Sequence, residues 1–202
     1  MKKRSFHPVN TLFWFYFLIL LPACAVGSLV IKINTSQDQN ARFDQYRSYS
    51  WYPATAASSS GGQRDYSMLQ AHVKKAIEQE FAKKGLHQEA ANPQLYLAYD
   101  VSLPEPAAAP AQAYPAGFGY GLAWHMGLRY DYGHANITNY QPVDTFAPGT
   151  ILIDVIDAST RELIWRGWAE EVIEDFNADY KTVANYVDDI VDKYPSRVPS
   201  QP

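Results

Sequence analysis

The 202-residue sequence has few charges and a single cysteine, and each scarcity excludes a class of protein. One cysteine cannot form an internal disulfide. Charged residues make up 19% of the chain, and acidic residues outnumber basic ones by 21 to 17, for a net charge of −4. Proteins that bind nucleic acid, or that dock by charge on anionic lipid, need a basic surface. The composition therefore argues against both.

Motifs of common enzymes and metal sites are also missing. The sequence has no Gly-x-Ser-x-Gly and no His-Glu-x-x-His, and the Ser/Gly-rich stretch 54–63 lacks phosphate-binding spacing. His125, Asp131 and His134 follow no regular ligand spacing, and the acidic 188–192 lies in a helical pattern rather than in a calcium loop. We therefore expect no enzyme activity, no cofactor and no metal.

The first 23 residues have the layout of a signal peptide. Lys2, Lys3 and Arg4 precede the apolar stretch 11–21. The tetrad that follows, Leu21-Pro22-Ala23-Cys24, resembles a bacterial lipobox. That resemblance implies that the Cys24 thiol carries diacylglycerol, that the chain is cut before Cys24, and that the new amino group is acylated.

Several acyl chains would hold the protein stably on a membrane where one would be marginal. Ala25 stands where an aspartate retains enterobacterial lipoproteins in the inner membrane, so the resemblance implies the outer membrane, facing the periplasm. Residues 24–28 would be the lipidated N-terminus and a short tether. Two alternatives remain open: residues 12–31 are about long enough for an uncleaved span, and cleavage could occur without a lipid.

The apolar stretch 149–173 predicts a β-hairpin on which the rest of the domain is organised. Residues 150–157 are rich in β-branched side chains, 163–170 carry two tryptophans, and the polar 158–162 predict a turn capped by Asp157. One apolar face then pairs Asp157 with Leu163, Val155 with Trp165, Ile153 with Gly167 and Ile151 with Ala169. The other face carries Leu152, Asp154, Ile156, Ile164, Arg166 and Trp168.

This register places Asp154 opposite Arg166. Such a cross-strand pair contributes about 0.2–1 kcal/mol, and a slip of one residue would send Trp165 to the wrong face. We interpret Asp154 and Arg166 as a structural ion pair that fixes the register, with a binding role as the alternative.

The same stretch resembles a known family. The runs 149–157 and 163–169, with weaker matches at 43–51, 92–95 and 194–195, are similar to bacterial envelope lipoproteins grouped as domain of unknown function 4136. The resemblance covers residues 29–195. It implies an envelope location and a fold, but no activity.

Periodicity elsewhere predicts the remaining elements. Helices separated by groups of strands indicate an α+β fold, an antiparallel-rich sheet of five or six strands with two helices on one face. We expect a single domain over 29–195 and a disordered tail at 196–202. Predicted strands cover 29–34, 47–52, 95–101 and, at an edge, 136–146, with a loop at 35–40; predicted helices cover 66–84, ended by Gly85, and 178–194, capped by Asn177.

Glycines alternate with aromatic residues over 117–133. This pattern is typical of a loosely paired loop, or of an aromatic contact surface for a glycan, a lipid head group or a partner protein. We expect the sheet face away from the helices to be half exposed, with this stretch beside it. The candidate contact residues are Phe118, Tyr120, Trp124, Tyr130, Arg166 and Trp168.

Together these features predict a non-catalytic envelope lipoprotein that binds or scaffolds an envelope protein or a glycan. The alternatives are a carrier with a pocket for a small lipid or glycan between sheet and helices, and an envelope hydrolase.

Overall fold

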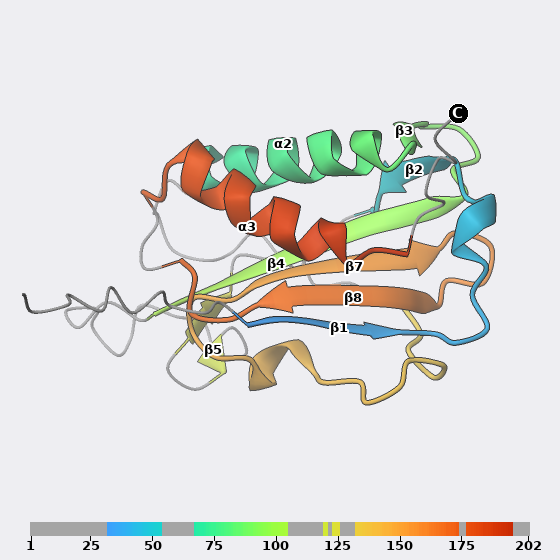
Figure 1. Cartoon of the computed structure of the whole chain (residues 1–202). Helices are drawn as coiled ribbons and strands as arrows, with labels where there is room; N and C mark the ends of the chain where they lie inside the picture. The colour runs from blue at the N-terminus through green and yellow to red at the C-terminus, as the bar shows by residue number, and fades with distance from the viewer. Residues whose placement is uncertain are drawn as a thin grey trace, which may run out of the picture. The chain divides into compact units, whose positions relative to one another are not determined.

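The computed structural model describes residues 32–53, 67–104, 119–120, 123–125, 132–173 and 177–195. These residues form two layers, a mixed sheet and a pair of helices on one of its faces (Figure 1). The predicted α+β class is therefore confirmed. The predicted signal peptide (1–23), tether (24–28) and tail (196–202) lie outside the described residues.

The main path of the sheet has the order β1-β8-β7-β4-β2-β3. Neighbours are antiparallel from β1 to β4, whereas β2 is parallel to β4 and β3 is parallel to β2. Off this path, β6 pairs with the end of β4, and β5 pairs with β6. The strands are β1 (Ile33–Gln37), β2 (Ser48–Trp51), β3 (His87–Gln88), β4 (Leu95–Pro104), β5 (Gly119–Tyr120), β6 (Ala123–His125), β7 (Ile151–Asp157) and β8 (Leu163–Ala169).

Strands β7 and β8 form the predicted hairpin in the interior of the sheet. The pairs Val155–Trp165, Asp154–Arg166, Ile153–Gly167 and Ile151–Ala169 match the predicted register. The side chain of Asp157 accepts the backbone N–H groups of Ser159 and Thr160, as predicted for the turn.

The prediction that Asp157 pairs with Leu163 is wrong, because the register shifts between Val155 and Ile156, and Ile156 pairs with Leu163. Such a bulge places an extra residue on one strand. As a result Leu163 packs on the face away from the helices, and Ile164 joins the core on the helix side.

Helix α2 (Ser67–Lys83) ends as predicted at Gly85, whose φ of 84° suits glycine. Helix α3 (Tyr180–Asp192) begins at Asp179, whose side chain accepts the N–H of Thr182 at 2.9 Å. The cap predicted at Asn177 is therefore wrong. Neither described helix is long and apolar enough to cross a membrane.

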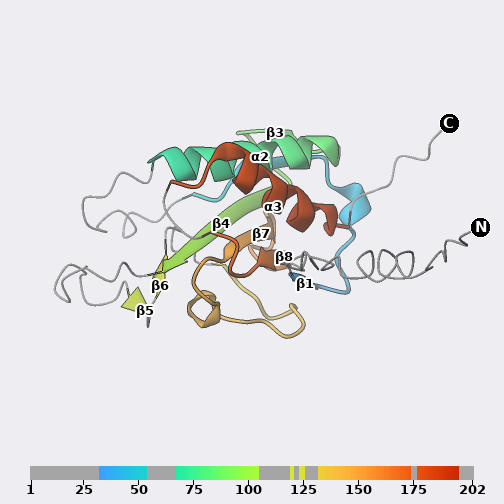
Figure 2. The ribbon, with the colours of Figure 1, turned by 60° about the vertical axis from the view of Figure 1, so that its left-hand side comes forward.

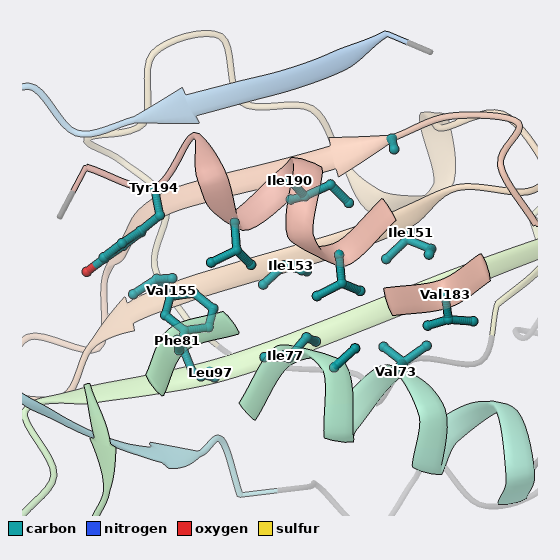
Figure 3. Packing of buried hydrophobic residues seen from close by; sticks show 14 of the residues in the cluster. Val73, Ile77, Phe81, Leu97, Ile151, Ile153, Val155, Val183, Ile190 and Tyr194 are labelled. Carbon is teal, nitrogen blue, oxygen red and sulfur yellow. The ribbon is translucent and has the colours of Figure 1, made fainter. Parts of the chain in front are cut away.

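The core lies between the helices and the sheet (Figure 3). The Trp165 side chain lies against Gly167, where a Cβ atom would be 2.3 Å from the indole Cη2, so this glycine leaves room for the tryptophan. The labelled core residues are Val73, Ile77 and Phe81 of α2; Val183, Ile190 and Tyr194 of α3 and its end; and Leu97, Ile151, Ile153 and Val155 of the sheet.

The predictions for three strands differ most from the structure. Strand β1 continues to Gln37 and so includes the first part of the loop predicted at 35–40, and β4 continues to Pro104. The edge strand predicted at 136–146 is absent there: this described segment holds the 3-10 helix η4 (Val143–Thr145) instead. A second 3-10 helix, η2 (Phe43–Gln45), precedes β2.

Candidate functional site

Residues 132–149 lie across the face of the sheet away from the helices (Figure 2). Ile137 packs with Ile156 and Leu163, and the ring centroids of Phe146 and Trp168 are 5.3 Å apart. The predicted half-exposed face is therefore wrong, since Arg166 is 1% and Trp168 9% exposed. Neither side chain is available as part of an open contact surface.

Asp154 and Arg166 form the predicted ion pair beneath this cover. Arg166 Nε lies 2.6 Å from Asp154 Oδ1, and Arg166 Nη2 lies 2.7 Å from Asp154 Oδ2. Two parallel N–H···O bonds of this kind are the strong geometry for arginine and a carboxylate. Both side chains are almost fully buried, so each neutralises a charge that would otherwise be costly inside the protein.

The pair also fastens the covering segment to the sheet. Arg166 Nη1 donates to the backbone carbonyl of Gln141 at 2.6 Å, and Nη2 donates to the Tyr132 hydroxyl at 3.2 Å. The Tyr132 hydroxyl in turn donates to Asp154, and the Tyr140 ring lies 4.8 Å from the guanidinium carbon. One buried arginine thus joins β7, β8 and both ends of 132–141.

These contacts determine the charge states. Burial, followed by the nearby Asp154 carboxylate, raises the pKa of Tyr132 well above its ordinary value. Burial opposes the charge of Arg166, but the Asp154 carboxylate outweighs it and the guanidinium pKa is raised. Arg166 therefore stays charged and Tyr132 neutral, which suits a permanent structural link rather than proton transfer.

A second charged cluster joins the two helices. Lys83 Nζ lies 2.6 Å from Glu80 Oε2 and 3.3 Å from Asp188 Oδ1. Burial raises the pKa of Glu80, although Lys83 opposes that change. Among the described residues, no group of three or more His, Cys, Asp or Glu side chains is placed to hold a metal ion.

Two of the predicted aromatic contact residues, Tyr120 and Trp124, lie in a separate pair of strands. Trp124 of β6 pairs with Leu103 of β4, and Tyr120 of β5 pairs with Ala123. Phe118 and Tyr130 lie outside the described residues. The β5–β6 hairpin therefore extends from the end of β4, separate from the buried Arg166.

This hairpin lies at the end of the sheet where β1 begins (Figure 1). One row of paired residues crosses the sheet there, namely Val101, Ile151, Ala169 and Ile33. The next residue of β4, Ser102, already pairs with His125 of β6. The start of β1 and the β5–β6 hairpin thus share one end of the sheet.

Tyr132, Tyr140 and the Gln141 carbonyl were not predicted as part of the site. Tyr140 and Gln141 lie in the segment that was predicted as an edge strand, and all three residues reach Arg166 only through the tertiary fold. The predicted charged pair on an otherwise apolar face of the hairpin was the available signal that further polar groups would cover that face.

Comparison with known proteins identifies a family. The model for a domain of unknown function (DUF4136) matches residues 33–196. No curated protein sequence is significantly similar to the chain.

Comparison with solved structures also found similar chains. A PDZ domain protein from Parabacteroides distasonis ATCC 8503 is 17% identical with a TM-score of 0.48, over 82% of this chain and 35% of that chain, so this chain spans well under half of that protein. A DUF4136 family protein from Bacteroides thetaiotaomicron VPI-5482 is 10% identical with a TM-score of 0.46, over 81% and 92% of the two chains. A PelC dodecamer from Paraburkholderia phytofirmans is 8% identical with a TM-score of 0.36, over 80% and 94%.

Proposed function

The chain belongs to the DUF4136 family, and we propose that it is a non-catalytic lipoprotein of the outer membrane that binds or scaffolds a partner in the periplasm. The observation that carries the proposal is the position of the only cysteine. Cys24 directly follows the apolar stretch and a small residue, and it stands eight residues before Lys32, where the described domain starts.

A lipid on Cys24 would keep the domain close to the bilayer. An extended chain spans at most about 3.3–3.6 Å per residue, so the Cα atoms of Cys24 and Lys32 are within roughly 29 Å of each other. Strand β1 begins at the next residue, Ile33. In this proposal the end of the sheet where β1 begins is therefore the end nearer the membrane.

The β5–β6 hairpin, which is part of the glycine–aromatic stretch, lies at that same end, and we assign the partner contact to this stretch. Tyrosine and tryptophan combine an apolar ring with a polar tip, which suits a surface that is partly wet. Phe118, Tyr120, Trp124 and Tyr130 are the contact residues of this proposal. Arg166 and Trp168 are left out because residues 132–149 cover them.

The buried polar groups support a structural rather than a catalytic assignment. Asp154, Arg166 and Tyr132 are hydrogen-bonded to one another, and Glu80 is paired with Lys83. Catalysis needs a nucleophile and a base positioned toward a substrate. The described space between the layers is occupied by core side chains, so nothing in it favours a ligand carrier.

Replacing Cys24 tests the anchor. Cys24→Ser should release the protein from the membrane fraction and abolish fatty-acid labelling, whereas the matched control Ser28→Ala should leave both unchanged. Mass spectrometry of the intact protein should find acyl chains only where Cys24 is present. Full membrane retention of Cys24→Ser, without lipid on the parent chain, would contradict the proposal.

The contact surface has its own test. A photo-crosslinking amino acid at Trp124 should capture a partner in intact cells, and one at Asp189, on the exposed side of α3, serves as the control. Equal recovery from both positions would remove the glycine–aromatic stretch from the proposal while leaving the anchor in place.

A further inference from the structure

In the described strand order, β1 is an edge strand of the sheet, and its neighbour is β8. Its five residues pair with β8 from Ile33–Ala169 to Gln37–Trp165, and the N–H of Asp38 continues this register by donating to the Ile164 carbonyl at 2.9 Å. In an antiparallel pair, alternate residues direct both backbone groups to the same neighbour. The backbone groups of Asp38 face β8. The backbone N–H and C=O groups of Ile33, Thr35 and Gln37, an odd number of residues away, therefore point out of the sheet.

This outer edge is open within the described part of the chain. Backbone hydrogen bonds from described residues outside β1 do not reach Ile33, Thr35 or Gln37 there. Thr35 is exposed. Natural edge strands are usually protected by lysine, proline or a bulge, yet residues 33–37 contain neither charge nor proline. The opposite edge strand, β3, has two residues and offers far less backbone.

The edge is complementary to itself. If two copies of β1 run antiparallel with Thr35 opposite Thr35 of the second copy, Ile33 lies opposite Gln37 in both directions. The outward N–H and C=O groups of these residues then bond to one another. The facing side chains are Thr35 with Thr35, Ile33 with Gln37 and Ser36 with Asn34, all of them uncharged. The Ser36 hydroxyl also donates to the Thr138 carbonyl of its own chain.

The flanking charges favour the same register. Lys32 of one copy then lies opposite Asp38 of the other. Because the two copies are related by symmetry, the same pair forms at both ends of the paired strands. Lys32 is exposed, whereas Asp38 is only 8% exposed and its Oδ1 accepts the N–H of Asn40 at 2.8 Å, so its carboxylate is fixed at the end of β1 with a small part of its surface open to a partner. A strand from an unrelated protein would have no reason to match both charges.

We propose that β1 is a homodimer interface, through which two copies of this chain join antiparallel into one continuous sheet. The symmetry is that of an isologous dimer, in which each copy offers the same surface. The axis passes through the sheet at Thr35, so the helices of both copies lie on the same side. The inference rests on the β1 edge and is independent of the lipid on Cys24.

Cysteine cross-linking in intact membranes tests the pairing and its register. A short bismaleimide should cross-link two copies of the full-length Thr35→Cys chain to each other. Ile33→Cys should cross-link to a differently tagged Gln37→Cys chain but not to itself. The unsubstituted chain gives the background from Cys24, and Thr160→Cys, in the exposed β7–β8 turn, is the matched surface control.

The outcomes are distinct. The proposal would be overturned if Thr35→Cys gave no more cross-linked product than Thr160→Cys. It would also be overturned if two Ile33→Cys chains cross-linked as readily as an Ile33→Cys chain with a Gln37→Cys chain. Capture of a different protein at Thr35, without self-cross-linking, would also overturn it in favour of a foreign strand.

Blocking the edge is the second test. Thr35→Pro removes an N–H that points away from β8, so the ladder inside the chain stays intact. Light scattering of the full-length chain in detergent should show the mass of two chains for the parent and for Thr35→Val, and of one chain for Thr35→Pro. A folded Thr35→Pro dimer, judged by circular dichroism, would contradict the proposal; if Thr35→Pro does not fold, the cross-linking pattern decides.

Discussion

At the scale of single residues, the buried pair of Asp154 and Arg166 has the largest predicted effect on stability. Arg166→Met leaves the Asp154 carboxylate buried without its counter-charge, which typically costs about 3–5 kcal/mol. The double variant Asp154→Leu/Arg166→Met removes both charges and should be more stable than Arg166→Met alone. Urea unfolding followed by tryptophan fluorescence gives the free energy of unfolding for each variant of this cycle.

Lys83→Met is the matched control for that cycle. It also removes a cation from an ion pair, but Lys83 is exposed and its loss should change stability little. If Arg166→Met and Lys83→Met shift the unfolding curve equally, the pair does not hold the covering segment as described. A double variant less stable than Arg166→Met would equally contradict the argument from uncompensated charge.

The same pair shows how far residue patterns can predict a site. Strand alternation placed Asp154 opposite Arg166, because side chains repeat every second residue and the apolar face fixes the register. The pattern could not show that Gln141 and Tyr132 would cover the pair, since those contacts join residues far apart in sequence. The sequence therefore predicted the ion pair but not its burial.

At the scale of elements, long periodic segments were predictable and their ends were not. The β7–β8 hairpin and both helices were predicted from the spacing of apolar residues, and Gly85 was recognised because few other residues adopt its φ. The bulge at Ile164 was not predictable, since an extra residue in one strand leaves no local signature. Strand β1 continued through Thr35 because pairing with β8 overrides its polar composition.

The start of α3 gives a prediction at this scale. Asp179→Ala removes the carboxylate that accepts the Thr182 N–H, so it should lower the thermal midpoint of the protein at neutral pH. Asp189→Ala, an exposed change on the same helix, should have a smaller effect. The backbone N–H of Thr182 lowers the pKa of Asp179, so the stabilisation is present above its ordinary pKa of about 4 and is lost as the pH falls through the lowered value.

The pH dependence separates a cap from a general loss of charge. The difference in midpoint between the parent chain and Asp179→Ala should be complete at pH 7 and should vanish in strong acid, where the carboxyl is protonated. A difference that persists unchanged in acid would show that Asp179 acts by another route.

At the scale of the whole molecule, the sheet is covered on both faces by different means. Helices α2 and α3 cover one face with apolar side chains, whereas residues 132–149 cover the other with aromatic rings and the Arg166 links. What stays open in the described residues is an edge, at β1, rather than a face. The proposed partner contact accordingly lies at one end of the sheet and the proposed dimer contact at its β1 edge, whereas both faces of the sheet serve stability.

Tyrosines distributed through these layers predict how the whole domain responds to alkali. Burial raises the pKa of Tyr46, Tyr49 and Tyr99 to about 12, and it also raises the pKa values of Tyr132 and Tyr194. Unfolded tyrosine ionises at about pH 10. Between about pH 10 and 12 the unfolded chain has therefore lost protons that the folded chain still binds, so stability is complete below that window and falls as the pH rises through it.

Urea unfolding at a series of alkaline pH values measures the free energy of unfolding, and tyrosinate absorbance of the folded chain measures how many tyrosines have ionised. Tyr99→Phe removes one largely buried group and should reduce the slope of the loss by up to about 1.4 kcal/mol per pH unit. The parent chain should retain a late-ionising group of tyrosines while it is folded. A folded chain whose tyrosines all ionise near pH 10, with stability unchanged across the window, would contradict the packing of the aromatic layers on both faces of the sheet.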